Sequence, residues 1–252
     1  DLFLSKEFDR TQEKENWRTG KKTSISKDSP VISQPGRLLK SLKPMLGYIS
    51  KEECNPDLVK CNLMVTKVPM GAQQLEAYAH FIQPQNLPFT DPKNRMAVMQ
   101  NWLRTIAAGG PDGPDFIREH SDLKPTSNYN PKTVMILEKL RECLERKEQC
   151  VVIYSRLHSG NEIAARLDKA GVKYSRIDST QSKHAKEASI FKSGKRPVML
   201  MGISCAQAYS FENCRNLIIG SLEWSYGKLN QAMGRVYRLN SKRDVNIYTI
   251  LH

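Results

Sequence analysis

An eight-residue motif in the last quarter of the chain combines two arginines with an amide at spacings that suit phosphate chemistry. It reads Gln231-Ala232-Met233-Gly234-Arg235-Val236-Tyr237-Arg238 and lies between two apolar runs, 217–219 and 245–250. In a helix, Gln231, Arg235 and Arg238 share one face, because residues three and four positions apart are neighbours there. Two permanently charged guanidinium groups beside an amide suit a polyphosphate whose charge shifts during phosphoryl transfer. The motif therefore predicts a phosphate-sensing helix, and a solvated basic helix is the alternative.

Alternating strand and helix signals from residue 130 onward are the elements that would position this motif. We predict strands at 151–154, 173–177, 197–201, 217–219 and 245–251. Helices are predicted around 137–144, at 183–192 and at 231–238. Another helix is predicted to begin near Ser159 and Glu162, which have the spacing of a capping box, and to end at Gly171. Gly194 is the predicted end of the helix at 183–192. This alternation predicts an α/β fold, in which a parallel sheet is covered by helices on both faces.

The residues before 130 carry weaker structural signals. Residues 1–66 are lysine-rich and are predicted to be irregular, apart from one short basic helix within 37–46. A strand is predicted at 63–68, followed by a helix with one apolar face made of Ala72, Leu75, Ala79 and Ile82. The proline-rich stretch 84–131 is predicted to be a connector with one helix near 96–106.

The net charge and the cysteine content indicate which binding partners and which cellular compartment to expect. The chain of 252 residues has a formal net charge of +13, which favours a polyanionic partner, with nucleic acid first and an acidic membrane surface second. No apolar run approaches the roughly 20 residues that span a bilayer, and the start does not resemble a signal peptide, so we expect no membrane partner. The six cysteines show no C-x-x-C pair and no zinc-finger spacing. They indicate reduced thiols in an intracellular protein, cytoplasmic or nuclear, with a metal site as the alternative.

Polar loops follow four of the predicted strands. In parallel sheets, ligands bind at the carboxyl ends of strands, where loops lead into helices. These loops offer hydroxyl groups and backbone amides to a phosphate backbone, and Arg156, Lys183 and Lys186 add positive charge. The loops are Ser155-Arg156-Leu157-His158, Asp178-Ser179-Thr180-Gln181, Gly202-Ile203-Ser204-Cys205 and Ser221-Leu222-Glu223-Trp224. Each hydroxyl taken singly is better explained as a helix cap, but a row of them along one sheet edge favours nucleic-acid binding.

Several segments together resemble the second RecA-like lobe of Swi/Snf-type ATP-dependent DNA translocases, which belong to helicase superfamily 2. The segments are Val151-Val152-Ile153-Tyr154-Ser155, Tyr174-Ser175-Arg176-Ile177-Asp178-Ser179-Thr180, Phe191, Val198-Met199-Leu200-Met201, Trp224 and the arginine motif at 231–238. A fainter likeness extends upstream through 39–46, Val68-Pro69-Met70 and Leu103-Arg104. The resemblance implies that residues 67–252 are the second RecA-like lobe, also called the helicase C-terminal lobe. Residues 1–66 would be the tail of the first lobe and a connector.

The resemblance also implies roles for individual residues. Arg235 and Arg238 would be the catalytic arginine fingers of motif VI, and Gln231 and Gly234 would help to bind ATP. DNA-binding positions would fall on Ser155, Arg156, Ser179, Lys183, Ser204 and Ser210. The implied parent hydrolyses ATP between two lobes and steps along duplex DNA. The expected partners are therefore DNA and the first lobe of the same parent chain.

Two features that ATP hydrolysis requires are missing from the sequence. The segment Gly20-Lys21-Lys22-Thr23 lacks the earlier glycine of a phosphate-binding loop, and no Asp-Glu pair follows a predicted strand to hold Mg²⁺. Because the sequence opens on Asp1 without an initiator methionine, we expect it to be cut from a longer protein. The resemblance places both features upstream of Asp1, so ATP and Mg²⁺ would be bound mainly by the first lobe. This chain alone would then be inactive.

Two other functions stay open. A nucleic-acid-binding module that no longer hydrolyses ATP would also lack these motifs, and a phosphate-binding loop with an Asp-Glu pair upstream of Asp1 would exclude it. An RNA helicase lobe of the same superfamily usually opens the arginine motif with His-Arg, where this chain has Gln231-Ala232. The chain also has Ala-Tyr-Ser-Phe at 208–211 where the Swi/Snf family has Gly-Leu-Asn-Leu, and Arg-Leu-Asn-Ser at 238–241 where it has Arg-Ile-Gly-Gln. Such divergence would suit a phage or viral branch.

Overall fold

The computed structural model describes residues 4–5, 9–15, 22–28, 31–32, 58–86, 92–108, 130–206, 209–222, 225–238 and 241–252. They fall into two units, Asp1–Pro56 and Asp57–His252. In the first unit, β1 (Leu4–Ser5) pairs antiparallel with β4 (Val31–Ile32), and β2 (Asp9–Glu15) pairs antiparallel with β3 (Lys22–Asp28). These four strands stand where irregular chain is predicted. The short helix predicted within 37–46 lies outside the described residues.

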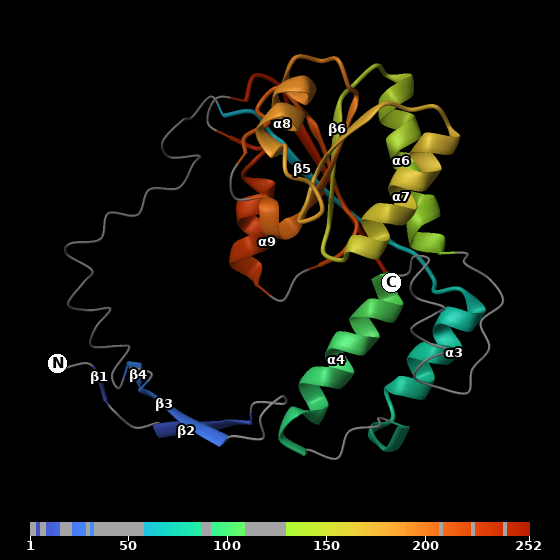
Figure 1. Ribbon diagram of the computed structural model, residues 1–252. Helices are drawn as coiled ribbons and strands as arrows, with labels where there is room; N and C mark the ends of the chain where they lie inside the picture. Colours follow the sequence, from blue (N-terminus) through green and yellow to red (C-terminus); the bar gives the residue numbers. More distant parts are fainter. Residues whose placement is uncertain are drawn as a thin grey trace. The chain divides into compact units, whose positions relative to one another are not determined.

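A six-stranded, all-parallel sheet forms the centre of the second unit (Figure 1). Its strands in spatial order are β5 (Cys61–Lys67), β10 (Val245–Leu251), β9 (Asn216–Ile219), β6 (Cys150–Tyr154), β8 (Val198–Gly202) and β7 (Tyr174–Ile177). The parallel sheet and all six predicted strands are confirmed, with ends that shift by one or two residues. Every residue of β6, β8 and β9 is buried, as expected for strands covered on both faces.

Helices cover both faces of the sheet, as predicted (Figure 1). On one face lie α6 (Pro131–Glu145) and α7 (Leu157–Lys169), and on the other lie α8 (His184–Lys192) and α9 (Tyr226–Met233). Alternate side chains of β6 divide between the two cores: Val152 packs in the cluster with α6 and α7, whereas Ile153 packs in the cluster with α8 and α9. Burying each such side chain contributes roughly 1.5–3 kcal/mol, so the two-sided core holds the sheet rigid.

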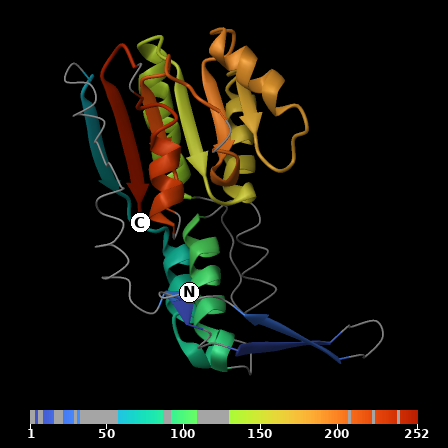
Figure 2. The same cartoon turned by 90° about the vertical axis from the view of Figure 1, so that its left-hand side faces the viewer.

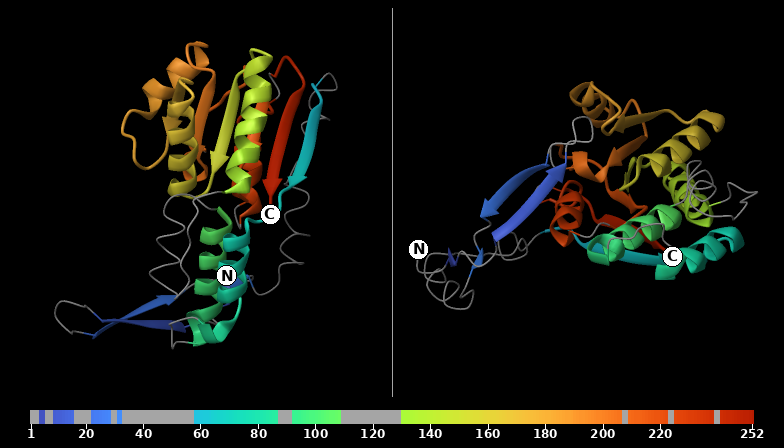
Figure 3. Two further views of the ribbon diagram at one scale, coloured as in Figure 1. Left: turned by 90° about the vertical axis from the view of Figure 1, so that its right-hand side faces the viewer. Right: turned by 60° about the horizontal axis from the view of Figure 1, so that its bottom comes forward.

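Two further helices pack against each other beyond the carboxyl ends of the strands (Figures 2 and 3). They are α3 (Ala72–Phe81), which is followed by the short 3₁₀ helix η1 (Pro84–Asn86), and α4 (Pro92–Ala108). The helix predicted near 96–106 is thereby confirmed. The predicted apolar face of α3 is wrong, because Ala72, Leu75, Ala79 and Ile82 are exposed. The helix turns Phe81 inward instead, and its ring packs edge-on against Trp102 with centroids 5.1 Å apart. The buried face of α3 is therefore the one that carries Ala77 and Phe81.

The predicted capping box of α7 is also wrong. The helix begins at Leu157, and Arg156 rather than Ser159 occupies the N-cap position. Ser159 Oγ donates a hydrogen bond to the Ala108 carbonyl (3.1 Å), and Glu162 accepts one from Thr133 Oγ1 (2.9 Å). Both side chains therefore tie α7 to its neighbours α4 and α6. The predicted helix ends at Gly171 and Gly194 are confirmed, since both glycines have positive φ, 67° and 76°.

Helix α7 lies so close to β6 that only glycine fits at residue 160. A Cβ atom there would lie 2.4 Å from Cζ of Tyr154, whose ring is fully buried. We expect Gly160→Ala to destabilise the protein by about 1–3 kcal/mol, because the ring has no free volume into which to move. The free energy of unfolding in urea measures this loss.

The matched control is Gly227→Ala, in the exposed first turn of α9. A Cβ atom at Gly227 has only Ser225 Oγ nearby, at 3.6 Å. This variant should gain up to about 1 kcal/mol from helix propensity. Equal effects of the two substitutions would contradict the close approach of α7 and β6.

Candidate nucleotide and nucleic-acid site

The four polar loops lie along one edge of the sheet. Ile153 of β6 pairs in register with Met201 of β8 and with Ile219 of β9, and Met201 pairs with Ile177 of β7. Because these strands are parallel and end at matching positions, the loops that follow them are neighbours. The predicted placement of the loops is thereby confirmed. The loop after β8 contains the 3₁₀ helix η2 (Ile203–Cys205).

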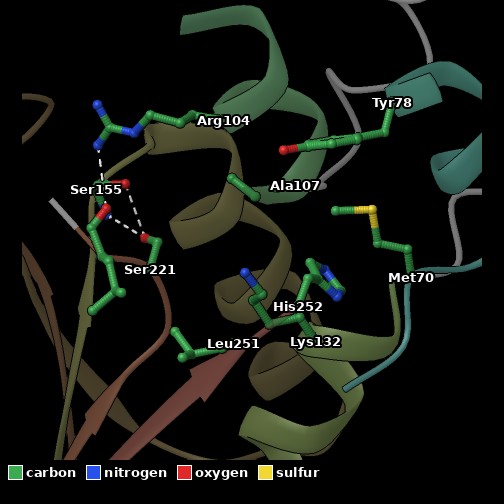
Figure 4. A pocket seen from close by; sticks show the side chains of 11 residues that line it. Met70, Tyr78, Arg104, Ala107, Lys132, Ser155, Ser221, Leu251 and His252 are labelled. Atoms are coloured by element: carbon green, nitrogen blue, oxygen red, sulfur yellow. Dashed lines mark hydrogen bonds between the residues drawn. The ribbon is translucent and has the colours of Figure 1, made fainter. Parts of the chain in front are cut away.

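Two serines join the loops that follow β6 and β9. The backbone N–H and the hydroxyl of Ser155 both donate to Ser221 Oγ, each at 2.9 Å (Figure 4). Since Ser221 Oγ accepts both of these bonds, its own hydroxyl proton points to a third group. The serine pair therefore presents a fixed hydroxyl donor at the middle of the sheet edge.

Helix α4 contributes to the same edge through side-chain contacts. Arg156 donates a hydrogen bond from Nη2 to Asn101 Oδ1 of α4. Arg104 of α4 donates from Nη2 to the Leu222 carbonyl oxygen at 3.2 Å. The guanidinium group of Arg156, predicted to bind DNA, is thus oriented by α4.

The other predicted DNA-binding side chains differ in accessibility. Ser179, Lys183 and Ser204 are exposed, and Ser210 is half-buried. Lys183 occupies the N-cap position of α8, and Ser204 lies in η2. Hydroxyl groups and one ammonium group are therefore open to a phosphate backbone along the loops after β7 and β8.

Asp178 holds the loop after β7 in place. Its carboxylate accepts hydrogen bonds from Tyr154 Oη (2.5 Å), Arg176 Nε (2.6 Å) and the Thr180 backbone N–H (2.9 Å). Burial alone raises the pKa of Asp178, but the hydrogen bonds from Thr180, Tyr154 and Arg176 outweigh it and lower that pKa to about 2. A carboxylate that is ionised and saturated with donors has a structural role, so Asp178 positions Ser179 without itself binding a ligand.

The arginine motif extends past the end of its helix, contrary to the prediction. Helix α9 ends at Met233 with Gly234 as its C-cap, so Arg235 and Arg238 lie in the turn that follows. Gln231 is exposed on the last turn of α9. Gly234 keeps a right-handed backbone, and the regular α-helical hydrogen-bond pattern is interrupted after it. The three residues therefore do not share a helix face, although helix-like hydrogen bonds from Arg235 N to Ala232 O and from Val236 N to Met233 O keep the turn compact.

Both arginines are tied to the segment after η2. Arg238 Nη1 donates to Ser210 Oγ at 2.7 Å, and the Arg235 carbonyl accepts from Phe211 N at 2.7 Å. Ser241 closes the turn, since its hydroxyl accepts from Arg238 N and donates to Val236 O, both at 3.0 Å. Nε of Arg235 is buried and has no hydrogen-bond partner among the described residues. An unpaired buried donor is costly, so this turn is suited to receiving an anion.

The donors present fit a phosphate better than a metal ion. Within the described residues, no three His, Cys, Asp or Glu side chains come together as metal ligands would. The five cysteines in that part of the chain are free thiols. No helix in the described ranges is both long enough and apolar enough to cross a bilayer.

Comparison with known proteins agrees with this geometry. The six-stranded parallel sheet with helices on both faces is a RecA-like lobe, and residues 135–240 match the model of the helicase conserved C-terminal domain. This part of the chain is a helicase C-terminal domain.

Solved structures show the same fold. The C-terminal part of the Fun30 ATPase domain aligns with a TM-score of 0.58 and 13% identity over 77% of this chain and 85% of that one. The SWI2/SNF2 ATPase core of Sulfolobus solfataricus, solved in complex with double-stranded DNA, aligns with a TM-score of 0.57 and 16% identity over 85% of this chain. The chain spans 46% of the length of that core. A comparison with curated proteins finds no match.

Three contacts at this site carry no signal in the sequence. The pairing of Ser155 with Ser221 joins residues 66 positions apart, and that of Arg238 with Ser210 joins residues 28 apart. The contact of Arg156 with Asn101 depends on where α4 packs. Residue types and strand ends locate such side chains at one edge, but their partners follow from the packing.

The hydrogen bonds of Asp178 make stability depend on pH. Because its folded-state pKa is about 2, whereas an unperturbed aspartate has about 3.9, Asp178 contributes about 2 kcal/mol of stability above pH 5. That contribution is lost as the pH falls from about 4 to 2. We expect the free energy of unfolding of Asp178→Asn to lie below that of the wild type at pH 7 and the gap to close by about 2 kcal/mol at pH 2. A gap that does not change with pH would contradict this assignment.

Proposed function

We propose that this chain is the second RecA-like lobe of a Swi/Snf-type ATP-dependent DNA translocase of helicase superfamily 2. In this proposal Arg235 and Arg238 act as arginine fingers, while Gln231 and Gly234 help to place the nucleotide. The DNA backbone lies along the loops that contain Ser155, Arg156, Ser179, Lys183, Ser204 and Ser210. The helicase C-terminal domain and the likeness of the fold to SWI2/SNF2 and Fun30 ATPase cores support it.

The observation that carries the proposal is the arginine turn after α9. Its backbone is held by Phe211 and Ser241, and it keeps a buried guanidinium Nε of Arg235 without a partner. A preorganised cation of this kind stabilises charge that develops on a transferred phosphoryl group. ATP, when bound, supplies that phosphoryl group, and the two guanidinium forks would contact its oxygen atoms.

The Arg238–Ser210 hydrogen bond suggests how nucleotide and DNA would be coupled. Arg238 belongs to the proposed ATP site, whereas Ser210 belongs to the proposed DNA-binding segment. A phosphate that recruits the guanidinium of Arg238 competes with Ser210 for the same donors. The conformation of the segment around Ser210 would therefore respond to the nucleotide.

The proposal assigns residues 67–252 to the second lobe and 1–66 to the tail of the first lobe and a connector. The rest of the first lobe, with the phosphate-binding loop and the Mg²⁺ ligands, would be supplied by the same parent chain. The compact unit begins at Asp57, and its edge strand β5 pairs along its whole length with β10. The connector would therefore enter the second lobe through β5.

Alanine substitution of the fingers in the longer parent protein tests the proposal. Arg235→Ala and Arg238→Ala should each lower kcat for ATP hydrolysis by about 10³-fold with DNA affinity nearly unchanged, because each removes charge needed only in the transition state. Lysine should restore neither activity, since an ammonium group does not replace the planar fork. Steady-state ATPase assays with saturating DNA measure these effects.

Two further variants act as controls. Arg243→Ala removes an exposed arginine between α9 and β10 and should leave kcat unchanged. Ser210→Ala breaks the hydrogen bond to Arg238 but keeps its guanidinium. If Ser210→Ala loses as much activity as Arg238→Ala, then Arg238 acts through that segment and is no finger.

DNA binding by the chain should be weak, independent of sequence and strongly dependent on salt. With about three to five phosphates neutralised, the slope of log affinity against log salt should be roughly −3 to −4. Arg156→Ala should flatten the slope by about one unit and weaken binding evenly across sequences. Fluorescence anisotropy with a labelled duplex at several salt concentrations measures both quantities.

Because Arg156 also contacts α4, Asn101→Ala is the matched control. This variant removes the side-chain acceptor of Arg156 at residue 101 but retains the positive charge. It should keep the wild-type slope. Deletion of residues 1–56 leaves β5 intact. If that deletion abolishes DNA binding while Arg156→Ala does not change it, the DNA contacts lie away from the sheet edge.

A further inference from the structure

A pocket with a buried, unpaired lysine lies beside the Ser155–Ser221 pair. It has a volume of about 390 Å³ and is bounded by the carboxyl ends of β9, β6 and β10, by the start of α6 and by α3 and α4. Lys132 on the first turn of α6 is only 6% exposed, and its ammonium group faces the pocket (Figure 4). Among the described residues, no acceptor forms a hydrogen bond with that ammonium group. We call this cavity the Lys132 pocket.

The charged side chains that line the Lys132 pocket are basic. Lys132 and Arg104 line it together with the imidazole of His252, and no aspartate or glutamate among the described residues does. Burial lowers the pKa of Lys132 to about 8, so the ammonium group is still mostly protonated at pH 7. Burial and the charge of Lys132 together lower the pKa of His252. The pocket therefore holds a desolvated positive charge that the described residues leave uncompensated.

Hydrogen-bond donors approach the same space from several elements. Tyr78 of α3 directs its hydroxyl group into the pocket, and Arg104 of α4 stands opposite (Figure 4). Ser221 Oγ accepts two hydrogen bonds from Ser155, which leaves its own proton to donate. Donors that converge from different directions suit a tetrahedral oxyanion better than a planar carboxylate. Met70, Leu222 and Leu251 give the rest of the pocket an apolar wall.

We propose that the Lys132 pocket binds the phosphate group of a phosphate ester. Lys132 neutralises the phosphate, while Tyr78 and Ser221 donate hydrogen bonds to its oxygen atoms. The apolar wall and the remaining volume receive the group that carries the phosphate. The ester is either part of a nucleic-acid strand or a small free molecule. This inference does not rest on the proposed function, because the chain can bind phosphate even if no ATP is hydrolysed by a longer parent.

Calorimetric titration of the 252-residue chain with inorganic phosphate at pH 7 and constant ionic strength tests the proposal. We expect saturable binding of one phosphate, which Lys132→Met weakens about tenfold or more because a charge-assisted hydrogen bond is lost. Tyr78→Phe, which removes only a hydroxyl group, should also weaken it. Lys139→Met changes another lysine of α6 that pairs with Glu142 outside the pocket, so it should bind as the wild type does. Methionine at residue 132 removes only a charge that has no partner, so the variant is expected to fold.

Three outcomes would overturn the proposal. They are the absence of saturable binding, equal affinity of the wild type and Lys132→Met, and acetate binding as tightly as phosphate. Two additional titrations identify the source of the phosphate. Displacement of phosphate by a short DNA duplex, with a loss of DNA affinity in Lys132→Met, supports a nucleic-acid strand. Tighter binding of thymidine 5′-monophosphate that DNA does not displace supports a small ester.

Discussion

The burial of three central strands on both faces is the constraint on which the rest of the structure depends. β6, β8 and β9 contain no exposed residue, and their alternate side chains contribute to two separate cores. A shift of one residue in any of these strands would exchange the two sets of side chains and disrupt both cores. The register fixed in this way places all the strand ends at one edge. The loops that carry Ser155, Ser204 and Ser221 are therefore neighbours because of the cores beneath them.

Two carboxylates have their hydrogen-bond partners within the protein, whereas two basic groups keep an unpaired donor. Asp178 has donors for both carboxylate oxygens, and Glu148 is bridged by Arg146, Arg215 and Asn216. By contrast, Nε of Arg235 is buried without a hydrogen-bond partner among the described residues, and the ammonium group of the largely buried Lys132 faces the Lys132 pocket. Leaving a buried donor unpaired costs about 1–3 kcal/mol, more for a charged group. Each of these two groups could gain a hydrogen-bond acceptor from a bound anion.

The sequence was sufficient to predict the elements whose signal is local. The central strands β6, β8 and β9 are short, mostly apolar runs, and the helices that end at Gly171 and Gly194 carry their stop signal in the sequence. The errors fall where packing decides. Helix α3 buries the face that carries Phe81, which packs on Trp102, and not the predicted face. The hydroxyl of Ser159 donates to the Ala108 carbonyl and therefore does not cap α7.

The candidate site follows the same division. The residue types and the strand ends located the loops, because parallel strands bring their carboxyl ends together. The partners of those residues could not be predicted, because Ser155–Ser221 and Arg238–Ser210 are contacts between distant parts of the chain. The end of α9 was missed because the arginine motif has helical spacing on both sides of Gly234, whereas the helix stops at that residue.

Helix α9 stands between the loop that carries Ser221 and the arginine turn. Ser221 of the Lys132 pocket lies four residues before Ser225, the N-cap of α9, whose hydroxyl accepts a hydrogen bond from Lys228 N at 3.3 Å. The arginine turn begins directly after the other end of the helix, which at 1.5 Å per residue is about 12 Å long. The length of this capped helix therefore sets the separation between its N-cap, Ser225, and the arginine turn.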